Sequence, residues 1–89
     1  MYSKTTVIKS ATGLHARPAS DFITAASKFK SKIVIRKDED GSEANAKSIV
    51  MLLSLALGQN ESVTITANGE DEIDAVDALV SMIENDFNV

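Results

Sequence analysis

The chain has 89 residues, a size that corresponds to one domain, and we predict a single domain spanning residues 1–89. Its composition, 44% hydrophobic and 25% charged, excludes a disordered or fibrous class, and its net charge of −4 argues against general nucleic-acid binding. The absence of cysteine excludes disulfides and thiolate metal sites, and it predicts a cytoplasmic location.

Charge is unevenly distributed along the chain. Residues 1–47 hold all nine basic residues and five acidic ones, a sum of +4, whereas residues 48–89 hold eight acidic residues and no basic one, a sum of −8. Such asymmetry is typical of a protein with an anionic ligand or an acidic partner. Two solvated faces of opposite sign would give the same pattern, and the sums alone leave both interpretations open.

No segment has the pattern of a membrane span or a signal peptide. The longest apolar run, residues 49–57, is interrupted by Ser54 and is too short to cross a bilayer. Residues 1–6 contain no apolar core of the kind that signal peptides require. We therefore expect no membrane insertion.

The first predicted elements are a strand and a helix. Residues 4–9 (KTTVIK) are rich in β-branched side chains and predict a strand, which ends before Gly13. Residues 16–29 predict a helix, because apolar residues recur along one face, and Pro18 fits its first turn. The apolar residues of that face are Ala19, Phe22, Ile23, Ala26 and Phe29.

The middle of the chain predicts a hairpin followed by a short helix. Residues 32–37 and 42–46 are the two strands, and residues 38–41 (DEDG) form the turn. Residues 48–57 carry signals for a strand and for a helix. Ile49 and Val50 favour a strand. Ser48 as an N-cap and Gly58 as a stop favour a helix, which we predict.

The last two elements have the clearest patterns. In residues 62–67 apolar and hydroxyl side chains alternate, which predicts a strand with one buried face. Residues 70–86 predict a helix that begins near Gly69, with acidic residues in its first turn. Its apolar stripe consists of Ile73, Val76, Leu79, Val80 and Ile83. The order β-α-β-β-α-β-α predicts an α+β fold, an antiparallel four-stranded sheet with three helices on one face.

His15 is the only histidine, and it lies at the predicted start of the first helix. Unpaired N–H groups at a helix start attract anions, and the guanidinium of Arg17 adds a donor fork suited to phosphate. A neutral imidazole is also a nucleophile, and Gly13 leaves room for a partner to approach. These features describe a histidine that accepts a phosphoryl group, although a surface histidine that merely packs the helix start would fit as well.

Other chemistries find little support in the sequence. One histidine without cysteine makes no His-rich metal site, so we expect no metal. The nucleophile motif GxSxG and the phosphate-binding motif GxxxxGK are both absent, so we expect no ATP site and no cofactor. A phosphoryl group would therefore have to arrive from another protein.

Three segments resemble signature motifs of the histidine-containing phosphocarrier family, HPr, of the bacterial sugar phosphotransferase system. They are residues 13–19 (GLHARPA), 45–49 (NAKSI) and 68–72 (NGEDE). They occur in the family's order and at its length, so the resemblance covers essentially the whole chain. It implies an open-faced β-sandwich with the element order given above.

The resemblance also implies a role for each signature residue. His15 would be phosphorylated on Nδ1 by enzyme I, with phosphoenolpyruvate as the ultimate donor, and would pass the group to sugar-specific IIA proteins or domains. Arg17 would stabilise the phosphoryl group. Ser48 matches a regulatory serine that an HPr kinase/phosphorylase modifies in many Gram-positive bacteria, where the phosphoserine form binds a catabolite-control repressor. We expect a monomeric stoichiometric carrier rather than an enzyme.

The family docks its partners on a patch formed by the first two helices. Here the resemblance assigns to that patch Thr12, Ala16, Ala19, Ser20, Lys47, Ile49, Met51 and Leu52. The apolar pattern alone would place Met51 and Leu52 in the core. Many relatives have glycine where this chain has Met51 and a small residue, often glycine, at Ala56, and residues 38–43 form a longer connection than usual. These departures leave the choice of partners open.

Three other functions remain as alternatives. A regulatory protein could act mainly through Ser48, but the family's regulatory paralogue lacks the active histidine. A carrier of the nitrogen-related branch fits the context of Ser48 less well. A structural domain with an incidental histidine would leave the combined motifs unexplained.

Overall fold

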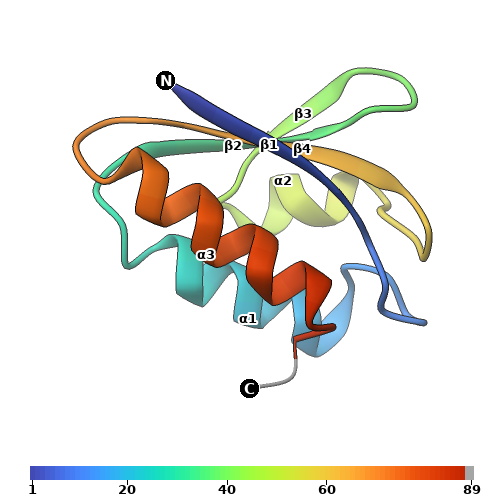
Figure 1. Ribbon diagram of the computed structural model, residues 1–89. Helices are drawn as coiled ribbons and strands as arrows, with labels where there is room; N and C mark the ends of the chain where they lie inside the picture. Colours follow the sequence, from blue (N-terminus) through green and yellow to red (C-terminus); the bar gives the residue numbers. More distant parts are fainter. Residues whose placement is uncertain (88–89) are drawn as a thin grey trace.

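The computed structural model describes residues 1–87; Asn88 and Val89, which the predicted domain includes, and the side chain of Ala16 lie outside the described residues. Seven elements follow one another in the predicted order (Figure 1). They are β1 (Tyr2–Val7), α1 (Ala16–Ala26), β2 (Lys32–Lys37), β3 (Ser42–Asn45), α2 (Ile49–Ser54), β4 (Ser62–Asn68) and α3 (Glu72–Glu84). No helix in the described part of the chain is long and apolar enough to cross a membrane.

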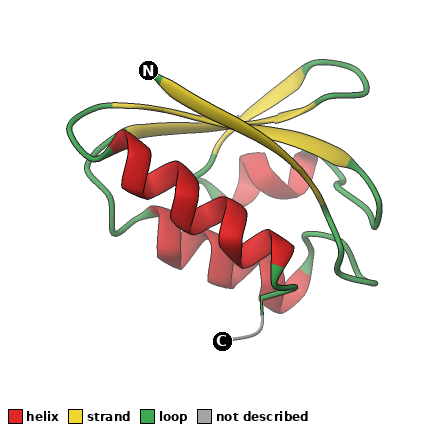
Figure 2. Ribbon diagram, in the orientation of Figure 1, coloured by secondary structure: helices red, strands yellow, loops and turns green. Residues whose placement is uncertain are grey.

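The four strands form one antiparallel sheet in the order β1-β4-β2-β3. β4 lies between β1 and β2, so the last strand of the chain joins its first strand to the central hairpin. All three helices cover the same face of this sheet, and the other face is bare (Figure 2). The predicted α+β fold class and its open-faced arrangement are therefore confirmed.

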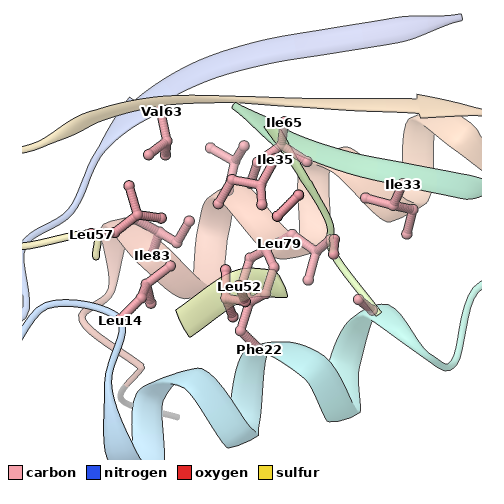
Figure 3. Packing of buried hydrophobic residues seen from close by; sticks show 14 of the residues in the cluster. Leu14, Phe22, Ile33, Ile35, Leu52, Leu57, Val63, Ile65, Leu79 and Ile83 are labelled. Carbon is pink, nitrogen blue, oxygen red and sulfur yellow. The ribbon is translucent and has the colours of Figure 1, made fainter. Parts of the chain in front are cut away.

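The core lies between the sheet and the helices. Phe22 of α1 and Leu52 of α2 point toward Leu79 of α3, beneath Ile35 and Ile65 of the sheet (Figure 3). All five of these side chains are fully buried. Because α1 packs against both α2 and α3, the start of α1 is held by the whole helical layer.

The strand β4 shows the predicted alternation, with one exception. Val63, Ile65 and Ala67 are buried on the helical side, as expected. Thr64 points to the bare face and yet is also buried. The reason is a polar network, since Thr64 Oγ1 donates to Asp38 Oδ1 at 2.8 Å and accepts from Arg36 Nη2 at 3.4 Å.

The ends of several elements differ from the sequence-based expectation. The first helix was predicted over residues 16–29 but ends at Ala26, because Lys28 N and Phe29 N donate to carbonyls three residues back, in turns rather than helix. The first strand was predicted over residues 4–9 but runs from Tyr2 to Val7, the part that β4 pairs with.

The start of the last helix also differs. α3 begins at Glu72 rather than near Gly69, and Asp71 occupies its N-cap position. The prediction that Ile73 belongs to the buried stripe is wrong, since 55% of this residue is exposed. Ala75 is buried instead, together with the four other predicted residues of the stripe.

Candidate functional site

His15 is the N-cap residue of α1. Its backbone is extended, with φ −126° and ψ 165°, and its side chain is exposed. Within the described residues, no side chain caps the first turn of this helix, and Pro18 in that turn has no N–H. The backbone N–H groups of Ala16 and Arg17 are therefore left without side-chain acceptors at the end of the helix where the dipole is positive.

The loop before His15 is anchored tightly. Gly13 has φ +68°, its N–H donates to Ser10 O at 3.0 Å, and the next N–H, of Leu14, donates to Leu57 O at 2.9 Å. A Cβ on Gly13 would collide with Leu57 O and Gly58 Cα, so only glycine permits this close approach. Leu14 is fully buried, so the residue before the exposed His15 is held in the core.

Arg17 lies two residues into the helix, with a side chain that is 90% exposed. Its Nε is 4.0 Å from Asp21 Oδ2, one turn further along α1, a long distance for an ion pair. An exposed ion pair of this kind contributes little to stability. The guanidinium therefore keeps its donors available for an anion bound at the helix start.

The imidazole, the uncapped start of α1 and the guanidinium are the three groups of the anion site that the sequence predicts. The backbone N–H groups supply partial positive charge, Arg17 supplies a full one, and His15 supplies a nucleophilic nitrogen. This arrangement suits a phosphoryl group that is carried rather than enclosed. In the part of the chain described, no three His, Cys, Asp or Glu side chains are grouped to hold a metal ion.

Ser48 is the N-cap residue of α2, as predicted. Its Oγ accepts a hydrogen bond from Met51 N at 3.3 Å, and the residue is half-buried. The neighbouring Lys47 is half-buried too, and its Nζ donates to Phe29 O at 2.7 Å, just beyond the end of α1. The cap and the lysine thus fix the start of α2 against the end of α1.

The structure places His15 and Ser48 at opposite ends of this helix pair. Leu57, which follows α2, meets the start of α1, whereas Lys47, which precedes α2, meets the end of α1. The two helices therefore run in opposite directions. The two predicted phosphorylation positions are not brought together in one site.

Two residues of the predicted docking patch are corrected by the structure. Ala19 and Leu52 are fully buried, so a partner cannot contact their side chains. Ala19 belongs to the buried core cluster. Leu52 is the one buried residue of α2, and it points into the core (Figure 3). For Leu52 the apolar pattern was the better guide than the resemblance.

The other patch residues are accessible to different degrees. Thr12, Ser20, Ile49 and Met51 are exposed, and Lys47 is half-buried. The side chain of Ala16 lies outside the description, so its prediction stays open.

Two exposed apolar residues of α2 were missed from the sequence. Val50 is 75% exposed and Leu53 is 40% exposed, beside Ile49 at 39% and Met51 at 45%. We call these four residues the α2 apolar surface. The signal was present, because a six-residue helix with five apolar residues cannot bury all of them.

An exposed histidine at an uncapped helix start, on an open-faced α+β sandwich, is the arrangement that the sequence resemblance led us to expect. A family model described as the phosphotransferase-system HPr component phosphorylation site matches residues 2–85. The chain therefore belongs to the HPr family, the phosphocarriers of the phosphotransferase system.

Individual relatives agree with this assignment. The chain is 46% identical to the phosphocarrier protein HPr of Haemophilus influenzae, over 93% of this chain and 95% of that one. It is 44% identical to the HPr-like protein Crh of Halalkalibacterium halodurans, over 97% and 100%. A crystal structure of HPr-C-His from Thermoanaerobacter tengcongensis is 47% identical, with a TM-score of 0.94 over 98% of this chain and 96% of that one.

Proposed function

We propose that this protein accepts a phosphoryl group on His15 from enzyme I and passes it to sugar-specific IIA proteins or domains. The observation that carries the proposal is the exposed imidazole of His15 at the uncapped start of α1, beside the loosely paired Arg17. The protein acts as a monomeric, cytoplasmic carrier that is used stoichiometrically. The downstream IIA partner sets the sugar.

The transfer step needs only groups that the site contains. The Nδ1 lone pair of a neutral His15 attacks the phosphorus, forming the N–P bond while the bond to the donor breaks and its electron pair returns to the donor. The Nε2 proton stays on the ring. The N–H groups of the first turn and Arg17 balance the charge of the phosphoryl oxygens during transfer, when positioning and electrostatics matter most.

Transfer onward is the same step in reverse. The acceptor nitrogen or oxygen of the next protein attacks the phosphorus, and the electron pair of the N–P bond returns to His15. A shallow site serves both directions, because successive partners must reach the same atom. The α2 apolar surface, with Thr12 and Ser20, provides the contact area around it.

We further propose that Ser48 is a regulatory phosphorylation site in carbon catabolite control, modified by an ATP-dependent HPr kinase/phosphorylase. Its partly accessible hydroxyl and its place beside the α2 apolar surface support this role. A phosphate at an N-cap is electrostatically tolerated, so its charge would alter partner binding without unfolding the domain. A regulator that acts only through Ser48 would have no use for the His15 site, and we therefore favour the relay as the main function.

The relay is tested with enzyme I and labelled phosphoenolpyruvate. We expect an acid-labile, base-stable label on the wild-type protein and none on His15→Ala. Transfer of that label to a IIA protein completes the test. A wild-type protein that takes up no label would overturn the proposal.

The serine branch has a separate test. Incubation with ATP and an HPr kinase/phosphorylase is expected to give an acid-stable label that Ser48→Ala abolishes and His15→Ala retains. A label that persists in Ser48→Ala would refute the placement.

A further inference from the structure

The loop that carries His15, residues 8–15, is supported by a second segment, residues 57–61. Four hydrogen bonds join them: Ile8 N to Glu61 O at 2.9 Å, Asn60 N to Ile8 O at 2.8 Å, Gln59 Nε2 to Lys9 O at 3.4 Å, and Leu14 N to Leu57 O at 2.9 Å. Three of them hold the far end of the loop. The Leu14–Leu57 bond alone acts on the residue next to His15.

The direction of the Leu57 carbonyl is set by the segment after α2. Ala56 has φ +51°, a left-handed conformation that is unfavourable for alanine, and its N–H closes a turn on Leu53 O at 3.1 Å. Lys37 Nζ lies 3.4 Å from Leu55 O and 3.7 Å from a carboxylate oxygen of Glu61. A lysine of β2 thus holds this segment at both ends, and the fully buried Leu57 side chain fixes its middle.

His15 has no comparable restraint of its own. Among the described residues its side chain makes no capping hydrogen bond, and it projects into solvent. Its backbone therefore sets where the imidazole is attached relative to the first turn of α1. That backbone is held on one side by α1 and on the other by the Leu14 N–H.

We propose that the backbone carbonyl of Leu57 is a positioning group for phosphoryl transfer at His15. It holds the Leu14 peptide so that Nδ1 and the N–H groups of the α1 start meet the same phosphoryl group. This inference rests on the proposed function of His15. Small misplacements of a reacting group lower transfer rates strongly, because the bound geometry must match the transition state.

The inference is tested by removing one donor while leaving every side chain in place. In a semisynthetic protein, an ester replaces the amide between Gly13 and Leu14, so that position 14 has no N–H. The matched control is an ester between Val7 and Ile8, which removes the 2.9 Å bond from Ile8 N to Glu61 O between the same two segments. Both esters are expected to lower the urea midpoint by similar amounts.

Transfer rates separate the two proteins. With saturating phosphorylated enzyme I, the Leu14 ester is expected to accept the phosphoryl group about tenfold more slowly than wild type, with an unchanged half-saturation concentration. The Ile8 ester should stay within about twofold of wild type in rate. The imidazole resonances of His15 should shift in the Leu14 ester and not in the control.

The outcomes are distinguishable from failure of the proposed function. If wild-type protein is not phosphorylated, the proposed function and this inference both fall. If wild type is phosphorylated and the two esters transfer at equal rates with equal His15 resonances, only the positioning role is overturned.

Discussion

Two corners of the molecule are built alike and used differently. Gly13, with φ +68°, and Gly69, with φ +156°, each let one loop lie against another. A Cβ would collide with Leu57 O at Gly13 and with Ser31 at Gly69. At the Gly69 corner the Asp71 carboxylate is hydrogen-bonded: it accepts from Lys30 N, Ser31 N and Ser31 Oγ, although it does not cap the first turn of α3.

At the Gly13 corner the corresponding side chains are exposed, and the one ion pair described there, Arg17 with Asp21, is long. His15 leaves the first turn of α1 without a side-chain cap, and Arg17 is 90% exposed. We call the Gly69 corner saturated, because the Asp71 carboxylate is hydrogen-bonded to the neighbouring loop. We call the Gly13 corner unsaturated, because the side chains of His15 and Arg17 are exposed there. The two corners therefore differ in the side chain they present, an exposed imidazole at one and a carboxylate bonded to the neighbouring loop at the other.

The largest expected loss of stability comes from adding a methyl group at either glycine. Gly13→Ala and Gly69→Ala should each destabilise the fold by about 3 kcal/mol, because alanine is strained there and meets backbone atoms that cannot move away. Urea denaturation measures this loss.

The rate of phosphoryl transfer should distinguish Gly13→Ala from Gly69→Ala. In conditions where both variants are folded, Gly13→Ala is expected to accept phosphoryl groups about tenfold more slowly, and Gly69→Ala at the wild-type rate. Equal losses of transfer in both variants would show that the two corners do not differ in function.

Arg17 tests the unsaturated corner directly. Arg17→Ala should change the free energy of unfolding by less than about 0.5 kcal/mol, because the side chain is exposed and loosely paired. Transfer should fall about tenfold or more, since a charge-assisted contact to the phosphoryl group is lost. Arg17→Lys, which keeps the charge without the planar fork, should lie between the two. An Arg17→Ala protein with normal transfer would remove Arg17 from the site.

A smaller effect is expected at Ala56, which precedes Leu57, the residue whose carbonyl accepts from Leu14 N at the Gly13 corner. Glycine adopts φ +51° freely, so Ala56→Gly should stabilise the fold by up to about 1 kcal/mol, while Ala56→Val should destabilise it by a similar amount. Thermal unfolding measures both. A destabilised Ala56→Gly would contradict a left-handed residue at this position.

The smallest effect, confined to acid, concerns the saturated corner. Hydrogen bonds from Ser31 and Lys30 lower the pKa of Asp71 from 3.8 to about 2. Because the folded pKa is the lower one, the carboxylate stabilises the fold fully above pH 4 and loses this contribution as the pH falls toward 2. Between pH 5 and 2 the stability of wild type should therefore fall more steeply than that of Asp71→Asn. If the stabilities of the two proteins fell equally with pH, the Asp71 carboxylate would not make these hydrogen bonds in solution.

Local signals were enough to predict the order of the elements and the place of His15 at the start of α1. Apolar periodicity, turn residues and, for α2, the N-cap and stop residues predicted the correct type for all seven elements. The residues around His15 lie close together in the chain, so their spacing shows their local geometry. Element ends were less predictable, because they depend on distant partners. β1, for example, ends where its pairing with Ser62 ends.

Tertiary contacts decided what the sequence left ambiguous. Nothing in residues 13–19 indicates that Leu14 is held by Leu57, since the two are joined only through the packing of α1 against α2. The burial of Ala19 and Leu52, by contrast, agrees with the apolar patterns of their helices, and it was the resemblance that assigned them to the docking patch. Asp71 looked like first-turn charge for the last helix, yet its carboxylate bonds to the loop before β2.

The most direct test of the account is nuclear magnetic resonance of the protein with ¹⁵N-labelled histidine, after incubation with enzyme I and phosphoenolpyruvate. The account predicts that Nδ1 of His15 becomes coupled to phosphorus, and that the coupling disappears when a IIA protein is added. A histidine spectrum that is unchanged by the phosphorylating system, or phosphorus bound to another residue, would contradict it.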